Sequence, residues 1–477
     1  MLGTRLKQLA GQSAIYGLGG IVSRLIAVFL LPVYTRYLTP DDLGAVGVVV
    51  ALTAVLVTIL RGGISSAFFR FTFDSPDPAR RRTVLRTSFW YTMAAATAGL
   101  VAGLILAEPI GRLLGIDDPT LVRAAFVGLW AQMNYEQLTA VFRVEQRAWA
   151  FLAASVVNIA ITVGATVLFV IVLEWGAVGV VAGSFTGTLL VYAVLLGYRR
   201  EQLGLELDRP LLRRMQRFGL PLVPSALALI VVNFSDRFFL SHLASLAEVG
   251  LYEIGARIAS AMVLLLTAFR AAWPAFAYSI EDDAEARRTY AFVLTYLVVV
   301  ATWMAVALGV LAPWLVRLLA TEEFYAGERV VAPLAFATAL FAGYIVISIG
   351  VGRAKRTEFN WVITGAAAVL NVALNLVLVP EFGMEGAAAS TVASYALLFV
   401  GMAWWARRVY PVPYQWRRVA TALAAGVALV VVAKALDVPL GVAILLALAY
   451  PLALLPLGFL LPGERARLRT LARLRSA

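Results

Sequence analysis

The sequence predicts an all-α membrane protein with about fourteen transmembrane helices, and three observations support this fold class. The chain of 477 residues is 61% hydrophobic and only 14% charged, whereas soluble domains are about half apolar and about a quarter charged. Apolar runs long enough to cross a hydrocarbon layer of ~30 Å, about 20 residues each as helix, recur along the whole chain. Two segments also recur about six runs apart, which indicates an internal repeat of the kind found in transporters.

The composition excludes several classes of function. Cysteine is absent and His242 is the single histidine, which excludes disulfides, thiolate chemistry and metal sites built from Cys and His. The formal net charge of +12 would suit nucleic acid, but the basic residues lie between apolar runs instead of forming a basic face on a soluble domain. We therefore expect no cofactor, no bound metal and no nucleic-acid partner.

The apolar runs define the elements in chain order. The first run follows Arg5 and Lys7 like the core of a signal peptide, but its length, Arg24 and Pro32 predict a helix that is retained. The predicted spans are 11–37, 43–67, 84–107, 121–142, 150–173, 177–198, 216–240, 248–270, 289–311, 329–350, 359–379, 385–406, 418–436 and 439–461.

The repeat groups these spans into lobes. "TPDDLG" after the first span matches "SLAEVG" after the seventh, and the connections "EWGAVGVVAGSF" and "EFGMEGAAASTV" share an aromatic-Gly-x-x-Gly turn before small residues. Matching spans run in the same direction, which predicts two six-helix lobes related by a pseudo-two-fold axis along the membrane normal, plus two C-terminal helices. The predicted divisions are 1–200 (N-lobe), 201–410 (C-lobe) and 411–477 (the last two helices and a basic tail).

Loop charge predicts the orientation, because cytoplasmic loops are enriched in Lys and Arg. With the amino terminus inside, most of the 40 basic residues fall on the inner side, while outer loops such as "GIDDPT" and "TEEFYAGE" are acidic. We therefore expect a multi-pass protein of the cytoplasmic (inner) membrane with both termini in the cytoplasm. The tail "ERARLRTLARLRSA" is either an amphipathic helix on anionic lipid or a solvated end.

Six ionisable residues fall within or near the predicted spans. An arginine that faces lipid at a helix centre costs about 2.5–3.5 kcal/mol, so we expect such groups to face a water-filled cavity or to pair with acids. Ser13, Gly17 and Gly20 share a helix face with Arg24, and this small and polar face favours a cavity beside that arginine. The six residues are Arg24, Arg61, Asp236, Glu253, Arg257 and Arg270.

Several of these charges have alternative structural roles. Glu253 and Arg257 are i, i+4 neighbours that can neutralise each other, so Arg257 is open to either pairing or ligand binding. Asp236 can pair with Arg237 instead of coupling an ion, and Arg270 can extend to lipid headgroups.

The positive charge of the arginines in the predicted spans predicts an anionic ligand. Arginines that converge without an equal number of acids favour phosphate, because the guanidinium group donates two parallel hydrogen bonds. An exporter of organic cations would need carboxylates instead. The fourth span is unusually polar, which suits contact with sugars as well as helix packing, and Asn371 and Asn375 are expected to hydrogen-bond between helices. The polar residues of the fourth span are Gln132, Glu136 and Gln137.

Two long stretches carry a resemblance to a known family. "IYGLGGIVSRLIAVFLLPVYTRYLTPDDLG" and "DRFFLSHLASLAEVGLYEIGARIA" closely resemble the polysaccharide transporters of the multidrug/oligosaccharidyl-lipid/polysaccharide (MOP) exporter superfamily, the Wzx-type flippases. The resemblance spans essentially the whole chain. MurJ-type lipid II flippases of the same superfamily have essential arginines that "VSRLIAVF", "ILRGGISSAFF" and "GLYEIGARIA" match at Arg24, Arg61 and Arg257. The sequence departs from that branch in the first outer loop and just after Arg24.

The resemblance implies a flippase, not an enzyme, that moves an undecaprenyl-diphosphate-linked oligosaccharide from the cytoplasmic to the outer leaflet by alternating access. Its partners would be this lipid-linked oligosaccharide, membrane lipids and a polysaccharide polymerase. Asp236 and Glu253 are candidates for coupling to protons, sodium or the membrane potential. The diphosphate would bind Arg24, Arg61, Arg257 and Arg270.

Three alternatives stay open. A lipid II flippase would use the same arginines. A cation-coupled drug exporter of the MATE type would have twelve helices and an essential acid in its cavity. A membrane-embedded glycosyltransferase or ligase would need catalytic acids at a membrane face and a large domain outside it.

Overall fold

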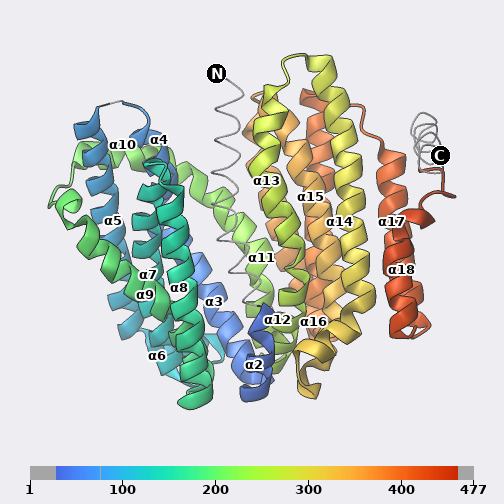
Figure 1. The fold of residues 1–477 in the computed structure, drawn as a ribbon, viewed down its shortest axis with the longest axis horizontal. Helices are drawn as coiled ribbons and strands as arrows, with labels where there is room; N and C mark the ends of the chain where they lie inside the picture. Colours follow the sequence, from blue (N-terminus) through green and yellow to red (C-terminus); the bar gives the residue numbers. More distant parts are fainter. Residues whose placement is uncertain (1–27, 76, 460–477) are drawn as a thin grey trace, which may run out of the picture.

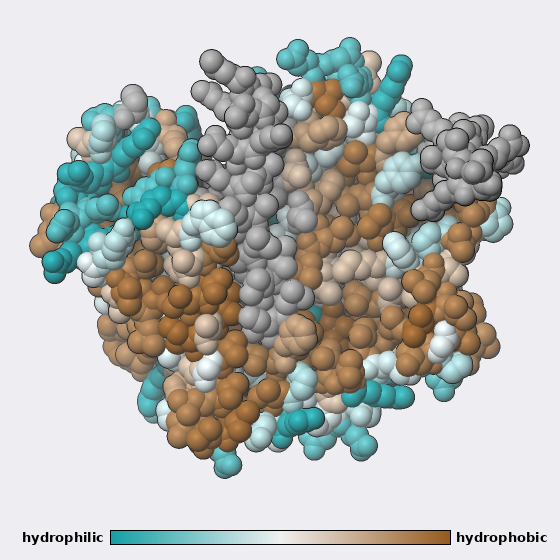
Figure 2. Space-filling model, in the orientation of Figure 1, coloured by the Kyte–Doolittle hydropathy of each residue, from teal (hydrophilic) through white to brown (hydrophobic). Residues whose placement is uncertain are grey.

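The computed structural model describes residues 28–75 and 77–459, which form helices joined by short connections (Figure 1). Ten helical segments in these ranges are long and apolar enough to cross a membrane, and Leu440–Ala453 is a shorter apolar helix. Figure 2 shows hydrophobic residues across the middle of the visible face and hydrophilic residues towards its two ends. The protein is an all-helical, multi-pass membrane protein.

The first group of helices, at the left of Figure 1, packs around α7, which contacts α3, α5 and α9. Its elements are α2 (Leu31–Tyr37), α3 (Pro40–Arg61), α4 (Ile64–Thr72), α5 (Pro78–Ile105), α6 (Ala107–Leu114), α7 (Pro119–Val144), α8 (Ala148–Val167), the π-helical turn η1 (Leu168–Val172), α9 (Gly176–Leu203) and α10 (Arg209–Gly219).

The second group packs around α15, which contacts α12, α14 and α16. The short turn η2 (Leu220–Leu222) connects it to α10. Its elements are α11 (Val223–Leu243), α12 (Leu246–Ala259), α13 (Met262–Ser279), α14 (Asp283–Leu319), η3 (Glu322–Gly327), α15 (Glu328–Arg353), η4 (Thr357–Phe359), α16 (Asn360–Val409), α17 (Trp416–Ala435) and α18 (Leu440–Ala453). Helices α17 and α18 lie at the outer edge of this group against α14 (Figure 1).

Two predicted spans are interrupted in the structure. The span predicted at 43–67 ends at Arg61, because Gly62 (φ 51°) and Gly63 (φ 73°) take the left-handed conformation that terminates α3. The span predicted at 248–270 is divided into α12 and α13 by a turn, where the Ser260 hydroxyl donates to the carbonyl of Arg257 at 2.6 Å. The predicted boundary between 359–379 and 385–406 coincides with a kink in α16 at Gly383 (φ 50°).

The two groups meet where α3 packs against α12, near α2 in Figure 1. Glycines make this contact close. A Cβ atom at Gly44 would lie 1.9 Å from the carbonyl oxygen of Leu246, and one at Gly250 would lie 2.0 Å from that of Pro40. Pro40 and Leu246 are the first residues of their helices, so the contact is reciprocal, as in a two-fold interface. We call this contact the glycine seam.

The repeated segments use the same structural devices on both sides of the seam. Thr39 and Ser245 are the N-caps of α3 and α12, and each accepts from the third residue of its helix. In both repeats that third residue, Asp42 or Glu248, is acidic. Glu248 accepts from the backbone N–H of Met384 at 2.9 Å, beside the kink of α16. The two helices therefore begin with the same capping arrangement.

Candidate functional site

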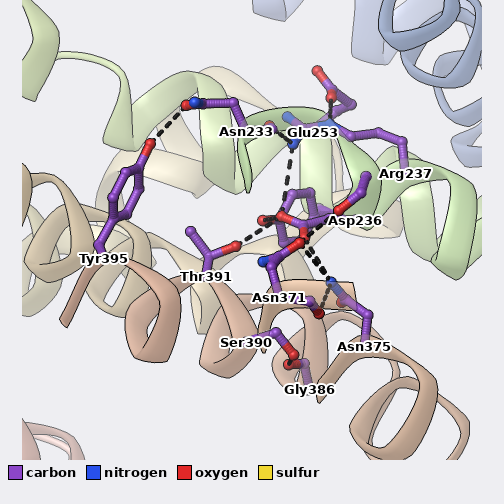
Figure 3. A network of polar contacts seen from close by, with 12 residues as sticks. Asn233, Asp236, Arg237, Glu253, Asn371, Asn375, Gly386, Ser390, Thr391 and Tyr395 are labelled. Atoms are coloured by element: carbon purple, nitrogen blue, oxygen red, sulfur yellow. Dashed lines mark hydrogen bonds and ion pairs between the residues drawn. The ribbon is translucent and has the colours of Figure 1, made fainter. Parts of the chain in front are cut away.

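The candidate site is a polar network buried between α11, α12 and α16 (Figure 3). Helix α11 supplies Asp236 and Arg237, which are 1% and 9% exposed. Buried charges require compensating partners, so the contacts of these two side chains define the site. The kink of α16 brings both of its halves within reach of α11.

Asp236 accepts hydrogen bonds from three side chains on two other helices. Tyr252 of α12 donates to Oδ2 at 2.5 Å, Thr391 of α16 donates to the same oxygen at 2.8 Å, and Asn375 of α16 donates to Oδ1 at 3.2 Å. All three donors come from side chains that are themselves buried. The carboxylate therefore occupies one defined position.

The amides beside Asp236 complete an oxygen-rich cluster. Ser235 donates to Oδ1 of Asn371 at 2.6 Å, and Asn375 donates to the same oxygen at 3.1 Å. Oδ1 of Asn375 and Nδ2 of Asn371 are buried and have no hydrogen-bond partner within the described residues. Carboxylate, amide and hydroxyl oxygens are the ligands that hard cations prefer. Groups of three or more His, Cys, Asp or Glu suited to a metal ion do not occur in the part of the chain that the structure describes.

Arg237 lies between this cluster and a second carboxylate. Its Nη1 is 3.9 Å from Oδ2 of Asp236 and donates to the carbonyl of Asn233 at 2.9 Å. Its Nε donates to Oε1 of Glu253 at 2.8 Å. The guanidinium also lies over the ring of Tyr252, 4.9 Å from the centroid. Figure 3 shows Arg237 reaching across from Asp236 to Glu253.

Glu253 connects Arg237 to Arg257 at the glycine seam. Oε2 of Glu253 lies 3.7 Å from Nε of Arg257, one turn further along α12. A Cβ atom at Gly47 of α3 would lie 2.9 Å from Cγ of Glu253, so the acid packs against bare backbone of the opposite group. Arg257 also lies over Tyr34 of α2, 5.2 Å from the ring centroid.

A second ion pair lies near the other end of α3. Nη1 of Arg61 is 2.7 Å from Oε2 of Glu136 on α7, and Gln132 donates to Oε1 of the same acid at 2.9 Å. Gln137 is instead buried at 4% exposure and donates to Ser88 of α5 at 2.9 Å. Gln132 and Glu136 therefore support Arg61, whereas Gln137 joins two helices of the first group.

The structure does not bring the predicted arginines into one cluster. Gly47 and Arg61 are about four turns apart on one face of α3, so Arg61 lies roughly 21 Å from the position of Glu253. Arg270 is exposed on α13, and Arg24 lies outside the described residues. The expectation of arginines without matching acids is wrong for Arg61 and Arg257, because insertion of each charge into the membrane favours a nearby acid.

Sequence reasoning missed the central position of Arg237. The sequence predicts Arg237 only as a partner for Asp236, although its contact with Glu253 is the shorter one. Asn371 and Asn375 hydrogen-bond between helices, as expected, but Thr391 and Tyr252 were not predicted. Their hydroxyls are detectable only once the kink of α16 and the angle of α12 are known.

Comparisons with known proteins identify the family and the fold. Residues 33–327 match the family model described as polysaccharide biosynthesis protein. A curated protein of the Lsg locus of Haemophilus influenzae is 24% identical over 272 residues, which are 54% of this chain and 63% of that protein's length.

Solved structures extend the similarity to the whole fold. The lipid II flippase MurJ in an inward closed conformation is similar at a TM-score of 0.73 with 12% identity, over 92% of this chain and 97% of that one. A multidrug resistance MATE family transporter of the MOP superfamily in an inward-facing conformation has a TM-score of 0.69 with 17% identity, over 81% and 98%. The chain therefore has the fold that these two transporters share. The family match and the shared fold lead to one conclusion: this chain belongs to the polysaccharide biosynthesis protein family and has the fold of the MurJ and MATE transporters.

Proposed function

We propose that the protein is a flippase that moves a polyprenyl-diphosphate-linked oligosaccharide from the cytoplasmic to the outer leaflet for polysaccharide biosynthesis. The observation that carries the proposal is Arg257. This arginine lies in a membrane-embedded helix at the contact between the two helix groups, and its side chain is 21% exposed. Its contact with Glu253 uses Nε at 3.7 Å, which leaves the paired Nη donors for a diphosphate.

The spacing of the arginines supports successive contacts with the diphosphate. Arg61 lies near the end of α3 that the basic loops assign to the cytoplasm, and Arg257 lies roughly 14 Å or more deeper, by the rise of a helix. The diphosphate of the substrate would first replace Glu136 as the partner of Arg61. It would then replace Glu253 as the partner of Arg257. Gln132 would contact the sugars. Arg24 and Arg270 stay candidates for further contacts along the same route.

Alternating access would be carried by two six-helix lobes within a chain of fourteen spans that has both termini in the cytoplasm. The reciprocal glycine seam and the matched caps of α3 and α12 support the pseudo-two-fold axis. The seam closes the end at which α3 and α12 begin, which the acidic loops assign to the outside. This conformation would receive substrate from the cytoplasmic (inner) face of the inner membrane.

Transport of the lipid-linked oligosaccharide would be coupled to a monovalent cation that binds at Asp236. The buried carboxylate, the amide oxygens and the Thr391 hydroxyl form a small oxygen-rich cluster, and one positive charge would offset Asp236. A polysaccharide polymerase would receive the translocated lipid at the outer face.

Transport in vesicles tests the proposal. Purified protein is reconstituted with a labelled undecaprenyl-diphosphate-linked oligosaccharide, and appearance of the label in the opposite leaflet is measured. We expect Arg257→Ala to lower the rate about tenfold or more, since a charged hydrogen bond contributes about 1.5–3 kcal/mol. Arg329→Ala is the matched control, because Arg329 is 63% exposed and pairs with Glu385 at 3.3 Å. Transport by Arg257→Ala at the wild-type rate would rule out the diphosphate contact.

The buried carboxylate of Asp236 favours one other candidate function, a cation-coupled exporter of organic cations. Asp236 would then be the essential acid, and the fold similarity to a MATE transporter agrees with this activity. The same vesicles distinguish the two functions. A flippase moves the lipid-linked glycan and leaves a fluorescent organic cation in place, and the exporter does the reverse.

A further inference from the structure

We propose that Arg237 and Glu253 link the cation cluster at Asp236 to the diphosphate contact at Arg257, so that cation and diphosphate bind cooperatively. This inference rests on the proposed function and adds its coupling route. Arg237 and Glu253 are positioning residues, because each acts through a neighbouring charge.

Four side chains form a continuous series of alternating charge. Asp236 and Arg237 are 3.9 Å apart, Arg237 and Glu253 are 2.8 Å apart, and Glu253 and Arg257 are 3.7 Å apart. Exposure rises along the series from 1% at Asp236 to 21% at Arg257. The series therefore runs from a buried cluster to the more accessible contact between the helix groups.

Each inner member of the series has two partners of opposite charge. Only the Arg237–Glu253 contact is a hydrogen bond, while the two outer contacts are longer. Charges at such distances in a low-dielectric interior interact strongly, so a change at one end alters the balance at the other. The two outer contacts are the ones that a ligand would replace.

The direction of the coupling follows from this arrangement. A cation beside Asp236 offsets its charge, so Arg237 is held by Glu253 alone. Glu253 then interacts more strongly with Arg237 and less with Arg257, which becomes available to a diphosphate. In reverse, a diphosphate on Arg257 releases Glu253 towards Arg237 and leaves Asp236 free to bind a cation. Coupling between sites is reciprocal by thermodynamic necessity.

The glycine seam connects this series of charges to the contact between the two helix groups. Glu253 packs against the backbone of α3 at Gly47, so its position depends on the contact between the two helix groups. Movement of Glu253 on ligand binding changes that contact directly. The series thus joins both ligands to the element that must open for transport.

The test measures binding of geranylgeranyl diphosphate to the purified full-length protein. Sodium chloride is varied and choline chloride keeps the ionic strength constant. We expect the wild-type Kd to fall between about 5- and 150-fold from zero to saturating sodium, the usual range of allosteric coupling. Arg237→Gln should bind the diphosphate with a Kd that sodium no longer changes. Arg237→Lys, which keeps the charge, should regain part of the sodium effect, unlike a merely structural replacement.

Two further variants complete the design. Glu253→Gln interrupts the series at its next member and should also remove the sodium effect, which provides a second test if Arg237→Gln does not fold. Arg329→Gln, on the exposed surface of α15, should keep the wild-type response.

The outcomes separate this inference from the proposed function. If the wild-type protein binds no diphosphate under any condition, the proposed function is wrong and the coupling falls with it. If the wild-type protein binds diphosphate without a sodium effect, or if Arg237→Gln and Glu253→Gln keep the wild-type sodium effect, the coupling is wrong and the flippase function stands.

Discussion

At the scale of single residues, this protein gives the buried charges of its candidate site specific partners, and Arg61 has one as well. Arg61 has Glu136, Arg237 has Glu253, and Asp236 has three donors. Removing one partner of a buried pair leaves an uncompensated charge, which costs about 3–5 kcal/mol. Single substitutions at these positions should therefore affect folding and ligand binding together, and test variants must keep side-chain shape.

Asp236→Asn is such a variant. The substitution preserves shape but replaces one carboxylate oxygen with a donor and removes the negative charge. In thermal unfolding, sodium at 100 times its Kd should stabilise the wild-type protein by about 2.7 kcal/mol, and Asp236→Asn should lose this stabilisation. Choline chloride is the control salt. Equal sodium stabilisation of both proteins would exclude Asp236 as a cation ligand.

Glu136→Gln tests the second ion pair. Loss of the carboxylate frees the Arg61 guanidinium, whose contact with Glu136 is 2.7 Å, while Gln132 can still hydrogen-bond to the new amide. We expect tighter binding of a polyprenyl diphosphate, by about tenfold, and slower transport because release is slower. Titration of the lipid and the vesicle assay give the two values. Weaker binding by Glu136→Gln would show that Glu136 positions Arg61 instead of competing for it.

At the scale of elements, backbone contact between α3 and α12 determines how the two groups meet. Side chains larger than hydrogen at Gly44 or Gly250 would collide with carbonyl oxygens of the opposite helix, and a backbone cannot move aside as a side chain can. Small residues at such contacts let membrane helices approach closely. The glycines therefore determine how closely α3 and α12 approach each other.

Gly250→Ala should open the seam. The new Cβ atom would lie 2.0 Å from the carbonyl oxygen of Pro40, so α12 must shift away from α3. We expect slower transport in vesicles and a lower melting temperature. Gly197→Ala is the matched control, since Gly197 is an exposed residue of α9 with nothing within 4 Å of its Cβ position, and alanine favours a helix by about 0.5–1 kcal/mol. Wild-type transport and melting of Gly250→Ala would contradict this account.

The connection between α9 and α10 carries a pH-dependent contact. Arg86 donates to Glu206 at 2.8 Å, and Thr83 donates to the same carboxylate at 3.0 Å. The hydrogen bond from Arg86 is the main cause that lowers the pKa of Glu206 below its ordinary value of 4.5. A lowered folded-state pKa contributes stability above the ordinary pKa, which is lost as the pH falls through the folded value. The difference in melting temperature between wild type and Glu206→Gln should therefore be constant well above pH 4.5 and shrink as the pH falls below 4.5 towards the lowered folded-state pKa. A difference that persists in acid would contradict the assignment.

At the scale of the whole molecule, the sequence predicted the all-helical membrane class because this class depends on patterns that the membrane imposes. Apolar length, loop charge and recurring glycine turns are all local in sequence. The site was harder to predict, since Arg237, Tyr252 and Thr391 come together only through the packing of three helices. Arg61 and Glu136 illustrate the same limit, because their pairing depends on how α3 crosses α7.

Alternating access can be tested by holding one end of the molecule closed. Thr39 before α3 and Glu322 of η3 line one pocket between the two helix groups. The chain has no cysteine, so Thr39→Cys with Glu322→Cys introduces its only two thiols. A short reducible cross-linker should stop transport in vesicles, and reduction should restore it. Each single variant is the control, and full transport by the cross-linked protein would show that this end does not open.

The series from Asp236 to Arg257 contains two acids and two arginines, so its net charge is zero. This has an energetic consequence for the step in which the empty protein returns to its starting conformation. Each uncompensated elementary charge that crosses a membrane at 100 mV involves about 2.3 kcal/mol of electrical work. A neutral set of side chains involves none when the emptied protein resets. The voltage across the bilayer then does no net work on these four side chains and acts on the cargo and the co-transported ion.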